Sequence, residues 1–388
     1  AVGAEYGHEN FENTGAIRGP FDVSRNNKAV FAEMRVPVLA RASSEMLTLS
    51  AALRRDDYSD FGNATTPQFG LEWYPFESLL VRAAYAGAFR APDLYAVYGP
   101  EISGIVSTSS LIDPRRNNEV ASGHTYRTGG NPSLLPETGR SVSVGAVWNP
   151  ADSGFRAALN WWKVSMTDRI SVFPSQQLVL NNESLFSDRV IRAAPGDDGL
   201  PGRVLHIDYS ALNLGDIWVE GVDLDLSYQI ETAWGTWSPS VRATRYTRYD
   251  ALLNPSVGMA DYLANANTDI WVPKLRATAG LGWNLGAWAA SLTGRYVGKY
   301  RDYNPLNDGQ YLQLGDRALW DLNIAWDLGR DELFRNGWFS KLRVAVGAVN
   351  LFDTQPQFSA STSPGYGFDG SQGDIRGRYI YGDISIHF

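Results

Sequence analysis

Apolar and polar residues alternate along much of this chain, in segments of about ten residues. Between Gly221 and Ile230, Asp, Ser and Gln fill every second position. The positions between them are apolar and comprise Val222, Leu224, Leu226, Tyr228 and Ile230. The same pattern recurs over residues 79–89 and 320–328. Because successive side chains of a β-strand point to opposite faces, each segment predicts a strand with one apolar and one polar face.

Two all-β architectures fit such strands: a soluble sandwich with a solvated outer face, and a transmembrane antiparallel β-barrel. The segments match the roughly 9 to 11 residues of a tilted membrane strand, whereas no run reaches the roughly 20 apolar residues of a spanning helix. Aromatic residues near strand ends favour the barrel, since barrels carry aromatic girdles at both interfaces. The relevant residues are Trp73, Tyr74, Trp148, Tyr228, Trp283, Trp288 and Tyr296.

The lengths of the connections favour the barrel more strongly. Short turns near residues 40–44, 75–77, 149–153 and 231–234 alternate with long loops at 90–138, 167–214, 251–271 and 351–377. Membrane barrels have short periplasmic turns and long external loops, and a sandwich has no reason to sort its connections in this way. We expect about 14 strands. Their approximate ranges are 1–10, 27–39, 45–58, 64–75, 78–89, 139–149, 154–166, 215–230, 235–250, 272–285, 286–300, 317–328, 339–350 and 378–388.

Composition excludes several functions. The chain of 388 residues has no Cys and a net charge of −8, which excludes a disulfide scaffold and argues against nucleic acid as a partner. No linker divides residues 1–388, so we expect one architecture. The four His do not lie at metal-ligand spacing and no nucleophile motif is present, so we expect no catalytic site, metal or cofactor. An outer-membrane enzyme remains a third possibility.

Short motifs along the chain resemble those of TonB-dependent outer-membrane receptors, in both order and spacing. Proline lacks the N–H donor that a strand ladder needs, so the prolines of these motifs belong where strands end. Asn350 and Asp353 can offer acceptors to the free N–H groups of a turn. We therefore expect the motifs to serve the architecture and not the ligand. The residues are Phe89, Arg90, Ala91 and Pro92; Asn131, Pro132, Leu134, Pro136 and Glu137; Gly221 to Leu224; Val272 to Lys274; Asn350, Leu351 and Phe352; and Gly377 to Tyr379.

The resemblance implies a barrel of 22 strands closed around a plug. With about 14 strands and no plug domain visible, residues 1–388 are expected to be the C-terminal portion of such a barrel, with an unpaired edge on the last strand. The resemblance implies active uptake of a scarce ligand across the bacterial outer membrane, surrounded by outer-membrane lipid and coupled to the TonB complex through a missing N-terminal segment. A passive porin-like channel is the alternative.

The end of the chain resembles the signal by which outer-membrane proteins are recognised by the barrel-assembly machinery. Alternation places Ile384, Ile386 and Phe388 on the lipid face and Tyr379 on the inner face. If the long loops face outward, this strand ends at the periplasmic rim.

The long loops hold the candidate ligand-binding residues, Arg115, Arg116, His124, Tyr126 and Arg127. Cationic and aromatic side chains suit a small anionic ligand such as a ferric siderophore, through charge-assisted hydrogen bonds and stacking. A glycan would also suit aromatic loops. In haem receptors of the family a loop His is an axial-ligand candidate, so haem is a further alternative, against that of a solvated loop imidazole at His124.

Overall fold

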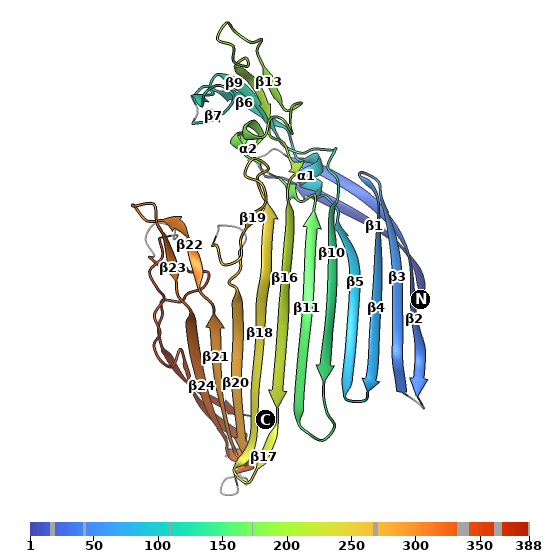
Figure 1. Cartoon of the computed structure of the whole chain (residues 1–388), viewed down its shortest axis with the longest axis vertical. Coiled ribbons are helices and arrows are strands. Elements are labelled where there is room, and N and C mark those ends of the chain that lie inside the picture. Colours follow the sequence, from blue (N-terminus) through green and yellow to red (C-terminus); the bar gives the residue numbers. More distant parts are fainter. Residues whose placement is uncertain are drawn as a thin grey trace.

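The computed structural model describes residues 1–15, 20–41, 44–108, 110–172, 174–266, 271–331, 341–360 and 367–386. Fourteen long strands form one antiparallel sheet in chain order (Figure 1), so the predicted strands are confirmed. They are β1 (Val2–Asn13), β2 (Phe21–Arg41), β3 (Ser44–Tyr58), β4 (Gly62–Phe76), β5 (Leu79–Arg90), β10 (Glu137–Trp148), β11 (Phe155–Thr167), β16 (Asp216–Tyr228), β18 (Gly235–Leu252), β20 (Leu275–Leu285), β21 (Trp288–Val297), β24 (Arg317–Asp327), β25 (Leu342–Val349) and β26 (Tyr379–Ile386). Two short strands, β17 (Ile230–Thr232) and β19 (Ala260–Asp261), flank β18.

Smaller elements lie in the connections. No helix within the described ranges is long and apolar enough to cross a membrane. The helices are α1 (Leu94–Tyr98), α2 (Gln176–Asn181) and the 3-10 turn η1 (Leu328–Arg330). The short strands are β6 (Ile102–Val106), β7 (Ile112–Asp113), β8 (Glu119–Val120), β9 (His124–Thr128), β12 (Ile170–Ser171), β13 (Val190–Arg192), β14 (Val204–Asp208), β15 (Leu212–Asn213), β22 (Tyr300–Pro305) and β23 (Tyr311–Leu314).

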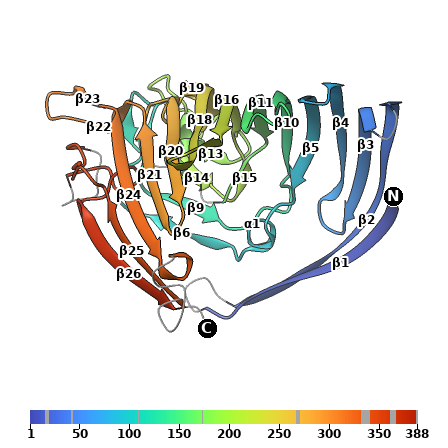
Figure 2. The ribbon, with the colours of Figure 1, turned by 90° about the horizontal axis from the view of Figure 1, so that it is seen from below.

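The sheet forms a curved wall, seen from its end in Figure 2. Within the described part of the chain, β1 pairs only with β2, and β26 pairs only with β25. The expected unpaired edge of the last strand is therefore present. Each edge strand carries backbone N–H and C=O groups that a further strand could pair.

Long loops and short turns lie at opposite ends of the sheet, as predicted (Figure 1). The turn end contains the connections β4–β5 and β16–β17–β18, whereas the loop end contains the elements between β5 and β10 and between β11 and β16. The final strand β26 runs toward the turn end, as the alternation predicted. Phe388 lies outside the described residues, and the role of Tyr379, Ile384 and Ile386 in barrel insertion stays a prediction.

The strand register confirms the two predicted faces. Leu224 on β16 lies opposite Leu159 of β11 and Ala243 of β18, and together they form part of an apolar face. Asp225, the next residue, points the other way and pairs with Arg242 at 3.3 Å and Arg156 at 3.6 Å. The polar face is the concave one: α1 lies inside the curve in Figure 2, and the neighbouring loop contacts residues of the polar face, as described below.

An aromatic girdle lines the turn end of the apolar face, as expected for the interface of a membrane barrel. Ring centroids lie 5.5 Å apart for Trp148 and Phe155, and 6.1 Å apart for Phe155 and Tyr228. The girdle continues through two further pairs on later strands. These are Trp237 with Trp283 at 6.1 Å and Trp288 with Trp326 at 5.3 Å.

Candidate ligand-binding loops

The two longest loops fold together into one small unit at the loop end of the sheet. We call the described residues of 91–136 and 168–215 the loop unit. Its central sheet has the order β13-β14-β9-β6, so each loop contributes two strands. Strand β9 pairs in parallel with β14, through Ile207 with Tyr126 and Asp208 with Arg127. The predicted long loops are therefore structured, and their structure depends on both segments.

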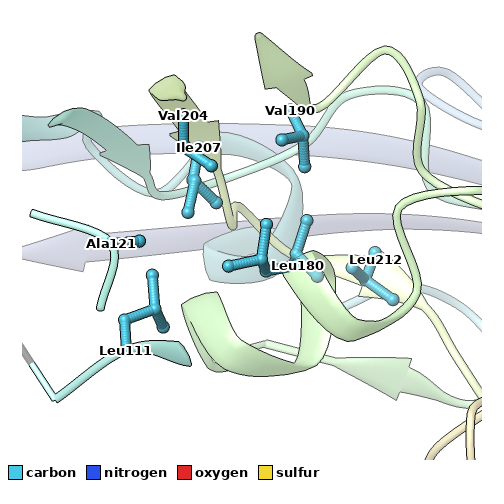
Figure 3. Close-up of a cluster of buried hydrophobic side chains, with 8 residues drawn as sticks. Leu111, Ala121, Leu180, Val190, Val204, Ile207 and Leu212 are labelled. Carbon is cyan, nitrogen blue, oxygen red and sulfur yellow. The ribbon is translucent and has the colours of Figure 1, made fainter. Parts of the chain in front are cut away.

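A hydrophobic cluster holds the two loops together (Figure 3). Val179, Leu180 and Ile207 of the second loop are almost fully buried. Leu111 and Ala121 of the first loop pack into the same cluster, which also includes Val190, Val204 and Leu212. Burying each large aliphatic side chain contributes roughly 1.5 to 3 kcal/mol, which offsets part of the entropy lost on ordering the loops.

A buried ion-pair network joins the same two loops. Arg192 of β13 bonds Asp113 of β7 at 2.6 Å and Glu183 at 2.5 Å, and Glu183 also bonds Arg115 at 2.8 Å. Burial by itself would raise the pKa of Asp113, but hydrogen bonds from Arg192 and the Arg115 N–H hold that pKa below its usual value. Hydrogen bonds to both carboxylates raise the pKa of Arg192. Asp113 and Arg192 are therefore charged in the folded loop unit.

The Phe89 to Pro92 motif attaches the loop unit to the sheet. Pro92 is fully buried, and its carbonyl accepts a 2.6 Å hydrogen bond from Arg25 of β2. Arg25 is itself buried and forms an ion pair with Glu9 of β1 at 2.6 Å. The next residue, Asp93, caps α1 by accepting a hydrogen bond from the Tyr95 N–H. The contact between Pro92 and Arg25 fixes the point where β5 leaves the sheet.

The motif from Asn131 to Glu137 anchors the other end of the first loop. The Asn131 side chain donates to the carbonyl of Ala211 at 2.9 Å, and buried Leu134 packs in a second hydrophobic cluster. Glu137 is buried, forms an ion pair with Arg90 at 2.9 Å and accepts a hydrogen bond from the Ile170 N–H. These contacts are internal, and Pro132 and Pro136 lie just before β10. That the motif serves the architecture and not the ligand stays a prediction.

The motif of Asn350, Leu351 and Phe352 directly follows the end of β25. Asn350 has a positive φ of 53°, and its side-chain oxygen accepts a hydrogen bond from the Thr354 N–H. Asp353 likewise accepts from the Arg378 N–H, so the predicted turn acceptors are confirmed. Leu351 donates its N–H to the carbonyl of Trp320, whereas the side chain of Phe352 is exposed.

Three of the five candidate ligand residues reach the surface of the loop unit. The side chain of Arg115 is 53% exposed and that of Arg127 is 44% exposed. Arg127 pairs with Asp208 at 3.1 Å. The ring of Tyr126 is partly exposed and lies 5.7 Å from that of Tyr209, between centroids. The structure thus brings two aromatic rings of the two loops together, whereas Arg127, the next residue of β9, points to the opposite face and pairs with Asp208.

The other two candidates lie inside the loop unit. Arg116 is buried and bonds Glu119, Asp198 and the carbonyl of Pro201. His124 is completely buried, and its Nε2 lies 2.8 Å from Oε1 of Gln176. The alternative of a solvated imidazole at His124 is therefore wrong. Ligand contact by any of the five residues stays a prediction.

Sequence reasoning missed the partners contributed by the second loop. Gln176, Asp208 and Tyr209 lie beside the candidates, although they are about 50 to 80 residues distant in the chain. Tyr209 has a raised pKa because it is partly buried and lies near Tyr126. No local pattern marks these residues, because Asp208 and Tyr209 approach the first loop through the pairing of β14 with β9, and Gln176 approaches it from α2.

Comparison with known proteins identifies the barrel. Residues 2–351 match the family described as TonB dependent receptor-like, beta-barrel. The chain belongs to this family. Members of the TonB-dependent receptor family are receptors and transporters of the bacterial outer membrane and not enzymes, which confirms the predicted fold, localisation and absence of catalysis.

Two similar curated proteins are vitamin B12 transporters. A vitamin B12 transporter of Vibrio vulnificus is 28% identical over 146 residues, which cover 37% of this chain and 18% of that protein. A vitamin B12 transporter of Vibrio cholerae is 32% identical over 84 residues, covering 22% of this chain and 13% of that protein. The matched segments are thus a small part of those transporters.

Similar solved structures support the same fold. The ferric enterobactin receptor of Pseudomonas aeruginosa has a TM-score of 0.65 and 17% identity, over 99% of this chain and 50% of that one. The siderophore receptor PirA of Acinetobacter baumannii has a TM-score of 0.65 and 14% identity, over 100% and 52%. The chain therefore spans about half the length of these receptors.

Proposed function

We propose that the protein carries out TonB-dependent uptake of a ferric siderophore or a similar iron complex across the outer membrane. The observation that carries this proposal is a receptor-family barrel whose two longest loops form an ordered unit at the loop end. Membership of the receptor family favours this function over the passive porin-like channel. The solved structures of similar fold are described as a ferric enterobactin receptor and a siderophore receptor, which supports the choice of ligand.

The exposed surface of the loop unit suits an anionic aromatic ligand. Arg127 can donate charge-assisted hydrogen bonds to anionic oxygens. The rings of Tyr126 and Tyr209 offer faces for stacking, and two neighbouring rings contribute about 0.5 to 1.5 kcal/mol beyond their buried area. Arg115 is half exposed and could supply a second cation. We propose that these side chains make the first contact with the ligand.

We further propose that the working protein contains a plug, a TonB-binding segment and further strands that close the sheet between β26 and β1. Each unpaired backbone group within the hydrocarbon of a bilayer costs several kcal/mol, so two open edges would be unfavourable there. The span of about half the length of similar receptors supports this proposal. The gene sequence upstream of Ala1 tests it: a plug coding region supports it, and another type of domain contradicts it.

Binding to the full-length protein tests the ligand. We expect Tyr126→Ala and Arg127→Gln each to weaken binding of a ferric tricatecholate complex about tenfold, which corresponds to about 1.4 kcal/mol. Quenching of intrinsic Trp fluorescence measures the dissociation constant. Arg330→Gln is the matched control, because Arg330 is also an arginine paired with an Asp, at 3.2 Å, but lies at the turn end. Wild-type affinity in both loop variants would argue against the proposed contacts.

Cobalamin is the second candidate ligand, because the similar curated sequences are described as vitamin B12 transporters. Cyanocobalamin and haem should be tested in the same fluorescence assay. Binding of cyanocobalamin without binding of the ferric complex would replace the siderophore proposal. Binding of haem through His124 would require the loop unit to open, because that imidazole is completely buried.

A further inference from the structure

A row of charged residues crosses the apolar face of the sheet at the same height on four neighbouring strands. Arg140, Lys163, Glu220 and Arg245 lie on β10, β11, β16 and β18, each eight residues from an aromatic residue of the turn-end girdle. The aromatic residues are Trp148, Phe155, Tyr228 and Trp237 in the same order. Positions between them on this face are apolar, for example Val142, Val144 and Ala146 on β10.

The height of this row corresponds to the outer boundary of the membrane. Eight residues of strand extend about 26 Å, and at a strand tilt of about 40° they cover about 20 Å along the membrane normal. The apolar band of such barrels is about 25 Å tall. The backbone of the row therefore lies about 5 Å inside the outer edge of this band, since the long loops of an outer-membrane barrel face the exterior. Long Lys and Arg side chains can extend over that distance to the outer-leaflet headgroups.

A bulge concentrates positive charge on this face. Register pairs Gly221 with Tyr246 but Glu220 with Arg248, so β18 carries one extra residue at that point. In a regular strand Arg245 and Arg248 would point to opposite faces, whereas the bulge places both on the apolar face. Contacts confirm the position of Arg248, whose guanidinium and the Lys163 amine both contact one oxygen of Glu220, at 3.7 Å and 3.3 Å.

The resulting patch is cationic, although the whole chain has a net charge of −8. Within the row, Arg140, Lys163, Arg245 and Arg248 meet one carboxylate, that of Glu220. Asp216, Asp250 and Asp261 lie on the same face further toward the loop end, where Asp250 pairs with Arg248. Arg140 and Arg245 are exposed and have no hydrogen-bond or ion-pair partner within the described residues. Arg140 lies diagonally beside Lys163, because Arg140 pairs with Ser165 and Lys163 with Val142.

The patch is local and does not encircle the barrel. At the same distance from the girdle, β21 and β24 carry Tyr296 and Ala318 on this face. Arg248 also lies over the ring of Trp218, with 5.9 Å between the guanidinium carbon and the ring centroid. An interface that merely tolerated charge would not explain why cations gather on these neighbouring strands.

We propose that this patch binds the phosphorylated headgroup of an outer-leaflet lipid. Arginine is suited to phosphate because its planar guanidinium donates two parallel hydrogen bonds. Clusters of Lys and Arg at the membrane surface attract anionic lipid headgroups. The proposal rests on the orientation of the barrel and is independent of the ligand that the receptor transports.

Lipid binding to the purified, delipidated full-length protein tests the proposal. Native mass spectrometry would count molecules of diphosphorylated lipid A retained by the wild type and by the double variant Arg140→Gln, Arg245→Gln. The double variant leaves the Lys163, Glu220 and Arg248 contacts intact. We expect it to bind lipid A at least about tenfold more weakly. The matched control is Arg82→Gln with Arg343→Gln, two exposed arginines on the concave face.

Several outcomes would overturn the proposal. Wild-type binding by the double variant would show that the two arginines are not needed. Equal retention of dephosphorylated lipid A would show that the acyl chains and not the phosphates are recognised. Displacement of lipid A by millimolar inorganic phosphate would indicate a site for free anions. Should the double variant fail to fold, Arg140→Lys with Arg245→Lys keeps the charge, and loss of phosphate-dependent binding in that folded protein would still support bidentate recognition.

Discussion

Replacing Arg192 with alanine is expected to unfold the loop unit locally while the barrel strands remain folded. The substitution leaves the carboxylates of Asp113 and Glu183 buried, with side chains only 2% and 9% exposed, and without their shared cation. Removing one partner of a buried ion pair costs about 3 to 5 kcal/mol. Such a loss is comparable to the burial of two or three large side chains, so we expect the hydrophobic cluster to separate as well.

Hydrogen–deuterium exchange of the full-length protein would measure this effect. A loss of about 3 to 5 kcal/mol corresponds to a decrease in amide protection of at least about a hundredfold in residues 91–136 and 168–215. Arg203→Ala is the matched control, because Arg203 is exposed in the same loop and has no ion pair among the described residues. Arg192→Lys should be intermediate, since an ammonium cannot bond both carboxylates in the same geometry. Unchanged protection in Arg192→Ala would refute the role of the network.

The strands were predictable because a membrane barrel imposes one rule on all of them. Each strand must present apolar side chains to lipid and polar ones to the interior. The faces of Leu224 and Asp225 could therefore be predicted from residue type alone, before their neighbours on other strands were known. Strand ends were less predictable. Strand β2 was expected at 27–39 but begins at Phe21, because residues near Asn26 are polar on both faces and carry no alternation.

The loop unit was not predictable from local patterns. Its strands are two to five residues long, too short for a measurable period, and β9 finds its parallel partner β14 about 80 residues away. The same holds for Asp113 and Arg192, which are 79 residues apart. A charged residue in a long loop is usually solvated, and only the folded structure shows that Asp113 is buried and that the side chain of Arg192 is only 10% exposed.

The candidate ligand residues illustrate the same limit. Residue type selected Arg116 and His124 together with Tyr126 and Arg127, because all four could contact an anion or a metal complex. Burial then separates them: the first two hold the loop unit together, and the last two reach its surface. The motif prolines were easier to interpret, because a missing N–H restricts Pro92 to the end of a strand whatever its partner. The partner itself, Arg25, could not be inferred.

The largest contrast between neighbouring residues is expected at the centre of β16. Leu224 lies four residues from both Tyr228 and Glu220, which places it near the bilayer midplane. Leu224→Arg should therefore cost about 2 to 4 kcal/mol of folding free energy in lipid vesicles. Residue 225 faces the interior, so Asp225→Arg removes two exposed ion pairs, with Arg156 and Arg242, and replaces them with charge repulsion. In water this change should cost about 1 kcal/mol or less of folding free energy. Equilibrium unfolding of the full-length protein from vesicles in guanidinium chloride would measure both. Because a shift of one residue in register exchanges the two faces, equal costs would show that the register of β16 is wrong.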